Sequence, residues 1–385
     1  MNIRVLYVFV VKKGLTTKTQ RTQKEKGKLL TCRSISSIMR AVVYYAPGDI
    51  RIEEVPKPEC GLGELLVRID ACAVCGTDLK SRQHGNPRIK APLIMGHEFT
   101  GIVETVSPDA VGGFQPGDRV VMATSISCGQ CFYCGRGWRN LCANLAPMGF
   151  SYPGGMAKYT VIPALALAGG HVIKVPPHVE AKCAALAEPI SCAVNSIQKC
   201  EVQNGDIVLV IGAGPLGLLN ALVARAAGAA AIFLSEPNPL RRKQAEQFEL
   251  DRILNPEVDD LSKIVRNVTG GRGADVVIVA APAVPPQEQA LSLVRRHGTV
   301  NLFASLPVGN SMLTIDSRMI HYDEIRLIGS SDSTPKHVQE AVAIIAEKKI
   351  PVEKIASHCL PLENIEEAFA LMTDGSALRV VLLCH

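Results

Sequence analysis

Residues 205–227 read GDIVLVIGAGPLGLLNALVARAA and combine three local signals in a fixed order. The apolar run Ile207–Ile211 has the length of a buried strand, and the glycine-rich turn Gly212–Gly217 follows it directly. The next stretch, Leu216–Ala227, has the composition of an apolar helix. A strand, a glycine turn and a helix in this order predict the first βα unit of a parallel sheet.

The segments downstream of this unit extend the same pattern. Short apolar runs alternate there with polar or helical segments, which is typical of buried strands joined by crossover connections. The predicted strands are Ala231–Leu234, Arg252–Leu254, Asp275–Ala280, Thr299–Phe303 and Ile325–Ile328. With Ile207–Ile211 they make six strands of a doubly wound parallel sheet, so we expect an α/β fold.

The chain upstream has a different, strand-rich character with Pro- and Gly-bearing turns. Its predicted strands are Ala41–Tyr45, Ile50–Val55, Leu65–Ala71, Gly101–Val106 and Arg119–Ala123. A tail of about residues 335–383 has amphipathic helical pieces, and we expect it to pack back on this first, β-rich part.

Composition narrows the function classes. The chain has 385 residues, of which 47% are hydrophobic and 20% charged, as in globular proteins with a real core. Residues 1–38 hold nine Lys/Arg and one Glu, which leaves 32 basic and 35 acidic residues in the rest. A folded body without excess positive charge argues against nucleic-acid binding. The most apolar early run, Val5–Val11, is far shorter than the ~18 residues of a membrane span, so we expect no membrane insertion.

Four cysteines crowd into one short segment with the spacing Cys-x2-Cys-x2-Cys-x7-Cys. Four thiolates form a closed tetrahedral shell for zinc, which leaves no position for substrate. The alternative is a redox or disulfide cluster. We therefore predict a structural zinc site at Cys128, Cys131, Cys134 and Cys142.

The glycine turn has the G-x-G-x-x-G pattern of a dinucleotide site. Its glycines let the backbone approach a pyrophosphate at a helix N-terminus. Glu236 ends the next predicted strand, where a carboxylate accepts both ribose hydroxyls and repels a 2′-phosphate, so NAD is favoured over NADP. Ser235, Arg241 and Arg242 lie nearby in the sequence and favour NADP instead, because their side chains can bind a phosphate. The predicted cofactor-binding residues are Gly212, Gly214, Pro215, Leu216, Gly217, Glu236 and Arg241.

A third group of residues is scattered: Cys75, the pair His97-Glu98, and Glu188. A Cys, a His and one or two carboxylates can bind zinc with one coordination position open, as a catalytic site requires. Spacing alone is weak evidence for this group, since a His-Glu pair is more often solvated or part of a core.

Together these motifs resemble the zinc-dependent medium-chain dehydrogenase/reductase family, in its sorbitol (iditol)/threonine dehydrogenase-like branch. The resemblance runs from about Met39 to the C-terminus. It rests on the four-cysteine segment, the glycine turn and shorter matching segments. These segments are Cys75-Gly76-Thr77-Asp78, Gly96-His97-Glu98-x2-Gly101, Pro116-Gly117-Asp118-Arg119-Val120 and Glu188-Pro189.

The resemblance implies a GroES-like catalytic domain at residues 39–190 and 331–385, with a Rossmann NAD-binding domain inserted at 191–330. It implies that Cys75 and His97 bind a catalytic zinc, and that Glu98 or Glu188 completes the shell directly or through water. It also implies that Thr77 hydrogen-bonds the substrate oxygen. Catalytic roles thus fall to Thr77, Glu98 and Glu188.

Two departures from the family pattern concern the proton and the substrate. Many relatives carry a proton-relay His five residues after the first zinc cysteine, where this chain has Lys80. Polyol dehydrogenases carry an Arg-Tyr pair where this chain has Gly329-Ser330-Ser331-Asp332. The second departure weakens an assignment to sorbitol itself.

The predicted function is NAD-dependent oxidation of a secondary alcohol, polyol or sugar-derived, to a ketone at a zinc ion, by a homodimer or homotetramer. The alternatives are amino-alcohol oxidation like that of L-threonine 3-dehydrogenase, and a zinc- and dinucleotide-binding protein without turnover. We expect a cytoplasmic protein. Residues 1–38 are interpreted as a disordered extension, an organellar targeting segment or the result of a start codon upstream of Met39.

Overall fold

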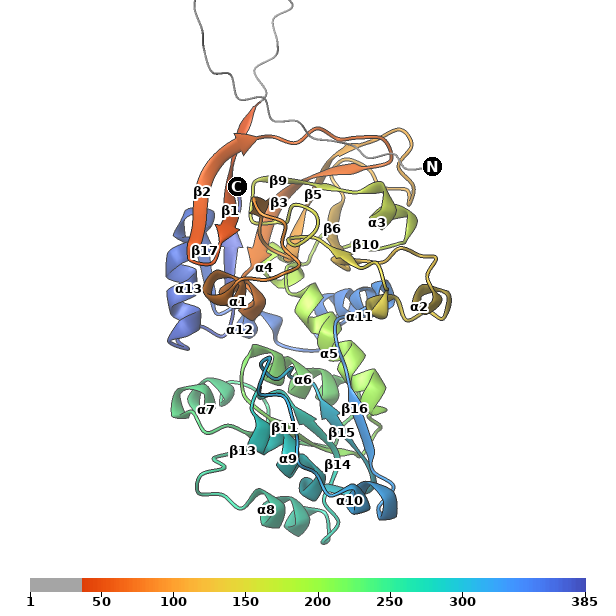
Figure 1. The fold of residues 1–385 in the computed structure, drawn as a ribbon, viewed down its shortest axis with the longest axis vertical. Helices are drawn as coiled ribbons and strands as arrows, with labels where there is room; N and C mark the ends of the chain where they lie inside the picture. Colours follow the sequence, from red (N-terminus) through yellow and green to blue (C-terminus); the bar gives the residue numbers. More distant parts are fainter. Residues whose placement is uncertain (1–36) are drawn as a thin grey trace, which may run out of the picture. The chain divides into compact units, whose positions relative to one another are not determined.

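The computed structural model of the protein describes residues 37–385, so the interpretation of the extension falls almost entirely outside the described residues (Figure 1). None of the helices in the described part has both the length and the apolar character that a bilayer crossing requires. The predicted α/β fold class is confirmed, with a strand-rich half and a parallel-sheet half.

The strand-rich half contains two main sheets, with the orders β2-β1-β4 and β10-β6-β5-β3-β18-β17, and β9 also pairs with β3. All its pairings except β17 with β18 are antiparallel. The strands of these sheets are β1 (Ile38–Ala46), β2 (Asp49–Pro56), β3 (Leu65–Ala73), β4 (Leu93–Ile94), β5 (Glu98–Val106), β6 (Arg119–Met122), β9 (Tyr159–Ile162), β10 (Val172–Lys174), β17 (His358–Pro361) and β18 (Val380–Leu383).

The tail of the chain completes this half. Val381–Leu383 of β18 pair with Ala71–Ala73 of β3, so a strand from the end of the described chain lies beside one from its beginning. Most of β3 is buried because other strands and helices cover both of its faces. The expected packing of the tail on the first part therefore occurs through sheet hydrogen bonds.

The second half is a six-stranded parallel sheet with the order β13-β12-β11-β14-β15-β16. The six predicted strands are confirmed, and their bounds agree to within one residue except at the start of β15. This strand begins at Val294 rather than Thr299 because Val294 pairs with Ala274 before a register irregularity. The strands are β11 (Ile207–Ile211), β12 (Ala231–Ser235), β13 (Arg252–Leu254), β14 (Ala274–Val279), β15 (Val294–Leu302) and β16 (Arg326–Gly329).

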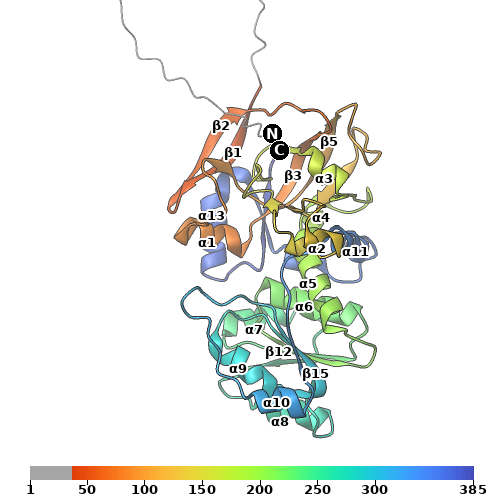
Figure 2. The ribbon, with the colours of Figure 1, turned by 45° about the vertical axis from the view of Figure 1, so that its right-hand side comes forward.

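Helix α5 (Ala187–Cys200) links the two halves, and the sequence patterns do not predict it. It lies beside α6 (Pro215–Ala226) of the parallel half and α11 (Pro335–Ala346) (Figure 2). It also contacts β5 and β6. One buried apolar cluster runs through α5 from Ala71 and Val121 to Val208 and Leu218. The two halves thus share a core, which fixes the ends of their strands relative to each other.

The remaining elements are short helices and one small hairpin. The first strand of the hairpin precedes the four-cysteine segment, and the second strand follows it. These elements are α1 (Gly76–His84), β7 (Ser125–Ile126), α2 (Phe132–Gly135), η1 (Arg139–Leu141), β8 (Ala146–Pro147), α3 (Ala164–Ala168), α4 (Ala181–Ala184), α7 (Pro239–Ala245), α8 (Leu261–Val268), α9 (Val284–Leu293), α10 (Ser317–Tyr322), α12 (Val352–Ile355), η2 (Leu362–Asn364) and α13 (Ile365–Thr373).

Candidate active site between the two halves

The neighbouring ends of β3 and β5 bring a candidate metal site together. Cys75 is the N-cap of α1, just after β3, and His97 and Glu98 stand at the start of β5. Because Ala73 pairs with Glu98 across the antiparallel ladder, these residues meet. The ligand atoms of Cys75, His97 and Glu98 all lie within 4.8 Å of one another. A thiolate, an imidazole and a carboxylate at this spacing form a donor set that suits zinc.

Asp78 supports two members of this group. One of its carboxylate oxygens accepts a hydrogen bond from the Cys75 backbone N–H at 2.9 Å. The other lies 3.6 Å from Nδ1 of His97. Burial by itself would lower the pKa of His97, but the Asp78 carboxylate and the Cys75 thiol raise this pKa well above its usual value. A carboxylate behind a ligating His orients the ring, so we assign Asp78 a positioning role.

Glu98 is the buried carboxylate of the group. Neither of its side-chain oxygens has a hydrogen-bond partner within the described residues, and Nδ1 of His97 also lacks one. The nearest cation is Arg379, whose Nη2 lies 3.4 Å from Oε1 of Glu98. Buried polar atoms in native proteins normally have partners. The orphaned Glu98 oxygens therefore fit a metal ion bound by this group, whereas Nδ1 of His97 faces the Asp78 carboxylate.

Glu188 reaches the same region from the first turn of α5, but it is not part of the group within 4.8 Å. Burial, reinforced by the nearby Glu98 carboxylate, raises the pKa of Glu188 to about 8. The Sγ atom of Cys192, one turn further along α5, lies 3.6 Å from Oε1 of Glu188. Of the two carboxylates that the sequence left as alternatives, Glu98 is thus the nearer to Cys75 and His97.

A cavity of about 200 Å³ contains all the predicted catalytic and catalytic-metal residues on its lining. Thr77, on α1, is among them, and its Oγ1 lies 3.7 Å from Sγ of Cys75. Phe150 and Leu216 supply apolar walls, and the Phe150 ring packs against His97 with 5.2 Å between centroids. The cavity is thus a small polar chamber that adjoins the metal-ligand group.

A second cavity, of about 890 Å³, is lined by every residue predicted to bind the cofactor. Gly212 has φ +108°, which favours glycine, and a Cβ on Gly217 would lie 1.9 Å from the Gly212 carbonyl oxygen. A Cβ on Gly214 would meet nothing within 4 Å, so this position leaves open space at the N-terminus of α6. These features fit a bound pyrophosphate.

Glu236 closes one side of this cavity and is 4% exposed. One carboxylate oxygen accepts a hydrogen bond from the Ala213 backbone N–H at 2.8 Å, and the other accepts one from Asn238 at 2.9 Å. Arg241 lies on α7 at the same cavity and is exposed. The Glu236 side chain is therefore held in place by the glycine turn, whereas the Arg241 side chain faces solvent.

The two cavities share lining residues. Cys75, Thr77 and Leu216 line both, so the metal-ligand group borders the dinucleotide space directly. Arg379 also lines the larger cavity. This is the relationship that a hydride transfer between a metal-held alcohol and a dinucleotide requires.

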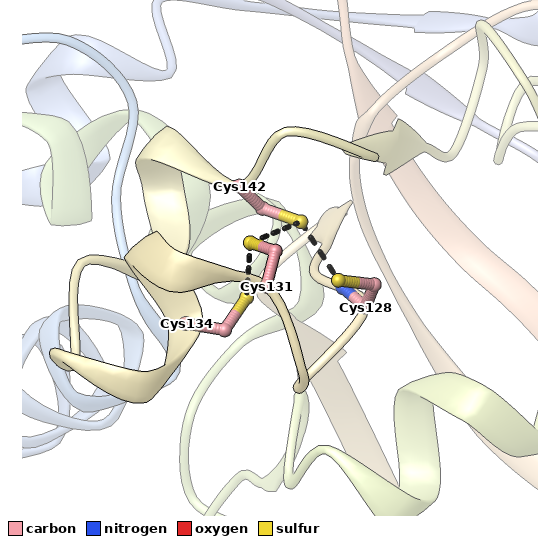
Figure 3. A group of neighbouring side chains, drawn as sticks. All are labelled: Cys128, Cys131, Cys134 and Cys142. Carbon is pink, nitrogen blue, oxygen red and sulfur yellow. Dashed lines mark hydrogen bonds between the residues drawn. The ribbon is translucent and has the colours of Figure 1, made fainter.

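The four cysteines of the other predicted metal site also come together, and their ligand atoms lie within 4.8 Å of one another (Figure 3). Sγ of Cys131 lies 3.5 Å from that of Cys134 and 3.9 Å from that of Cys142. Backbone N–H groups, that of Cys134 first, lower the pKa of Cys131 to about 6, which favours the thiolate. All twelve cysteines in residues 37–385 are free thiols, so the geometry fits a metal rather than disulfides.

Several residues at the site were not assigned a role from sequence. Asp78 stands inside a quoted motif, and its position three residues after Cys75 is a signal for a capping contact. Arg379 is separated from the motifs by a long stretch of chain, whereas Ser125 lies between the segment that ends at Val120 and Cys128, and no spacing signals either residue. Asp332 belongs to the segment that departs from the family pattern, and no sequence motif assigns it a role of its own.

Comparisons with known proteins agree with this arrangement. Residues 61–181 match the alcohol dehydrogenase GroES-like domain, and residues 215–347 match the zinc-binding dehydrogenase domain. The chain is 31% identical to a sorbitol dehydrogenase of Halalkalibacterium halodurans over 351 residues, covering 89% of this chain and 99% of that one. It is 34% identical to an L-threonine 3-dehydrogenase of Pyrococcus horikoshii, covering 91% and 99%.

A solved structure from Sinorhizobium meliloti 1021, described as a zinc-binding dehydrogenase bound to NADP, is similar throughout. Its TM-score is 0.83 at 30% sequence identity, and the match covers 90% of this chain and 99% of that chain. Both halves of the fold, the glycine turn and the metal-ligand group are therefore accounted for by one family. The chain belongs to the zinc-dependent medium-chain dehydrogenase/reductase family, in its sorbitol/threonine dehydrogenase-like branch.

Proposed function

We propose that this protein oxidises a secondary alcohol of a polyol or sugar-derived substrate to a ketone and transfers the hydride to NAD. The observation that carries this proposal is the shared lining of the two cavities by Cys75, Thr77 and Leu216. A substrate carbon in the smaller cavity would thus lie next to a nicotinamide in the larger one.

In this proposal Cys75, His97 and Glu98 hold the catalytic zinc, and Glu188 lines the substrate side of the same chamber. Zinc, when bound, acts as a Lewis acid toward the hydroxyl oxygen and lowers its pKa. Asp78 keeps His97 oriented through Nδ1. Arg379 balances the charge of Glu98 from the opposite side.

Thr77 is proposed to accept the proton of the substrate hydroxyl through its own hydroxyl, which can donate and accept at the same time. Lys80 lies one helical turn further along α1, lines the dinucleotide cavity and is exposed. The proton therefore has a polar route along one face of α1 toward solvent.

The four-cysteine group is proposed to hold a second, structural zinc. Four thiolates leave no open coordination position, so this site carries no step of the reaction. Its role is to fix the loop between β7 and β8, which borders the substrate cavity through Ser125 and Pro147.

NAD is proposed as the preferred dinucleotide because of Glu236. Its buried carboxylate occupies the position where a 2′-phosphate would add negative charge, whereas ribose hydroxyls would donate to it. The similar Sinorhizobium meliloti protein was solved with NADP bound. In this chain Arg241, on the lining of the larger cavity, is the residue that favours NADP.

Two sets of relatives bear on the substrate. The sorbitol dehydrogenase relative supports a polyol, and the L-threonine 3-dehydrogenase relative supports an amino alcohol. A panel of polyols, sugar acids and amino alcohols, assayed by the absorbance of the NADH that forms, tests the proposal. Polyol oxidation is the expected result, and turnover of amino alcohols alone would contradict it.

A matched variant tests whether zinc takes part in turnover. We expect two zinc ions per chain in the wild-type protein and one in Cys75→Ser, with turnover lost. Cys359→Ser, at an exposed thiol on β17, is the control and should keep both ions and full activity. Near-normal turnover in Cys75→Ser would contradict the proposed role of the catalytic zinc. One zinc per wild-type chain would support a zinc- and dinucleotide-binding protein without turnover.

The assembly and location proposed are a homodimer or homotetramer in the cytoplasm, acting on a small-molecule substrate. Light scattering of the purified chain measures the first. A monomeric mass would contradict the proposed assembly without affecting the reaction.

A further inference from the structure

The smaller cavity contains a carboxylate that the reaction described above does not use. Asp332 follows β16, at the crossover from the parallel sheet to α11, and lines the cavity together with Cys75 and His97. Its φ is +58°, a left-handed conformation that Asp adopts more readily than most residues. Such a conformation persists when surrounding contacts impose it, and it is common at ligand sites.

Each oxygen of this carboxylate already accepts one hydrogen bond from a neutral donor. The Ser125 hydroxyl donates to Oδ2, and the Ser333 backbone N–H donates to Oδ1 at 2.7 Å. No ion pair involving Asp332 occurs within residues 37–385. A carboxylate has about four acceptor positions. Asp332 therefore retains acceptor capacity inside a cavity that holds the reacting groups.

Polar side chains from α5 and from the four-cysteine loop hold residues 331–333. Asn195 of α5 donates through Nδ2 to the Asp332 carbonyl oxygen at 2.8 Å. The Ser191 hydroxyl, one turn earlier on α5, bonds the Ser333 hydroxyl at 2.7 Å. From the four-cysteine loop, Asn140 donates to the Ser331 carbonyl oxygen at 2.9 Å. The carboxylate is thus held in advance of binding, as a recognition group must be.

The other charged groups on the cavity lining do not bind the free acceptor positions of the Asp332 carboxylate. Arg88 is exposed, and its guanidinium stacks on the Phe150 ring with 4.9 Å to the centroid. Burial raises the pKa of Asp332, although the Ser125 hydrogen bond opposes this effect. The charges of His97 and Arg88 also lower the pKa of Asp332, but neither residue forms an ion pair with it. A desolvated acceptor gains more from a fitting donor than a hydrated one does.

We propose that Asp332, positioned by Ser125, determines specificity by accepting a hydrogen bond from a second hydroxyl of the substrate, next to the carbinol that is oxidised. The inference rests on the proposed function and names the feature that a substrate needs. A substrate hydroxyl donates its single proton to one of the acceptor positions that Ser125 and Ser333 leave free on the Asp332 carboxylate. An ammonium group would bind the same carboxylate as an ion, so the comparison with an amino alcohol distinguishes the two partners.

The selectivity between butane-2,3-diol and butan-2-ol, which differ by this one hydroxyl, tests the inference. We expect wild-type kcat/KM to favour the diol by at least about tenfold, since a site built for a hydroxyl rejects the analogue lacking it. Asp332→Ala should reduce this ratio by about ten- to a hundredfold, mainly through KM of the diol. Asp332→Asn, which keeps one acceptor oxygen, and Ser125→Ala should each reduce it by less.

Three outcomes would overturn the inference. One is an unchanged ratio in Asp332→Ala, and another is an equal loss with both alcohols, which would indicate a structural role. The third is a larger loss with 3-aminobutan-2-ol than with the diol in Asp332→Asn, because this pattern identifies an ammonium partner. Asp109→Ala, at an exposed carboxylate, is the matched control.

Calorimetric titration of butane-2,3-diol into the zinc-loaded protein separates this inference from the proposed function. If the wild-type protein oxidises neither these two alcohols nor any polyol of the panel, the proposed function fails, while the binding difference between wild type and Asp332→Ala still answers the question about Asp332. We expect weaker diol binding in Asp332→Ala and, to a smaller degree, in Asp332→Asn, whose side chain suits the left-handed backbone as Asp does. Equal binding would overturn the inference.

Discussion

Arg379 and Glu98 form a buried pair in which Nη2 lies 3.4 Å from Oε1, with exposures of 2% and 1%. The two residues come from opposite ends of the chain, Glu98 from β5 and Arg379 from the residue that precedes β18. Arg379 also donates through Nη1 to the Val74 carbonyl oxygen at 3.1 Å, next to Cys75. One guanidinium therefore supports the backbone beside one metal ligand and the charge of another.

Replacing Arg379 with Met should destabilise the fold by about 3–5 kcal/mol, because removing one partner leaves a buried charge without compensation. Urea denaturation of the zinc-loaded protein measures this change. The double variant Arg379→Met/Glu98→Gln should recover part of the loss. Arg40→Leu removes an exposed pair with Glu363 and should change stability by less than about 1 kcal/mol. Equal effects of the two Arg substitutions would contradict the compensating role.

Glu236→Gln should shift dinucleotide preference. The amide keeps hydrogen-bonding capacity but loses the charge that repels a 2′-phosphate, so the ratio of kcat/KM for NAD to that for NADP should fall by about tenfold or more. Steady-state kinetics with both dinucleotides measure the ratio. Glu257→Gln, at an exposed carboxylate on the same cavity, is the control. An unchanged ratio in Glu236→Gln would show that the Glu236 carboxylate does not determine the dinucleotide preference.

His171 makes stability depend on acid pH. It is fully buried, and its neutral ring bonds the Ala123 carbonyl oxygen through Nδ1 at 3.0 Å and the Ser127 N–H through Nε2 at 3.3 Å. Burial lowers its pKa to about 4. Between pH 6.5 and 4 the unfolded chain binds the extra proton, so stability falls as pH falls, by about 3 kcal/mol in all.

Urea denaturation at a series of pH values tests this window. His171→Gln keeps a donor and an acceptor but does not titrate, so its stability should change less between pH 6.5 and 4 than that of the wild type. His297→Gln, at an exposed site, should retain the wild-type dependence. Parallel pH profiles for wild type and His171→Gln would exclude His171 as the cause.

Cys131→Ser tests the four-cysteine site. With one thiolate lost, we expect one zinc per chain instead of two and a clearly lower melting temperature, because metal binding energy contributes to folding. Metal analysis and calorimetry measure both quantities. Cys60→Ser, at a cysteine outside both groups, should change neither. A variant that keeps two zinc ions would show that this group does not bind the second one.

The parts of the site that lie close together in sequence could be predicted from it. The turn Gly212–Gly217 specifies its own conformation, because close backbone approaches at Gly217 exclude any side chain. The four cysteines likewise occupy one loop. Both groups come together without help from distant elements, so their spacing carries the information.

The parts that depend on tertiary pairing could not be predicted in this way. Whether Glu98 or Glu188 stands nearer to Cys75 is decided by the β3–β5 register and by the position of α5, a helix that the patterns did not indicate. Asp332 enters the cavity because Asn195 and Ser125, from two other elements, hold it there. No local period or motif encodes such contacts.

The pairing of β18 with β3 also bears on how the chain is made. The residues of β3 that receive β18, Ala71–Ala73, immediately precede the metal-binding segment, yet their partners leave the ribosome about 300 residues later. The contiguous parallel sheet can assemble during translation, and β9 can pair with the first residues of β3, whereas Ala71–Ala73 wait for β18. Unpaired strand edges invite wrong partners, so this short edge is exposed to mispairing until β18 has been synthesised.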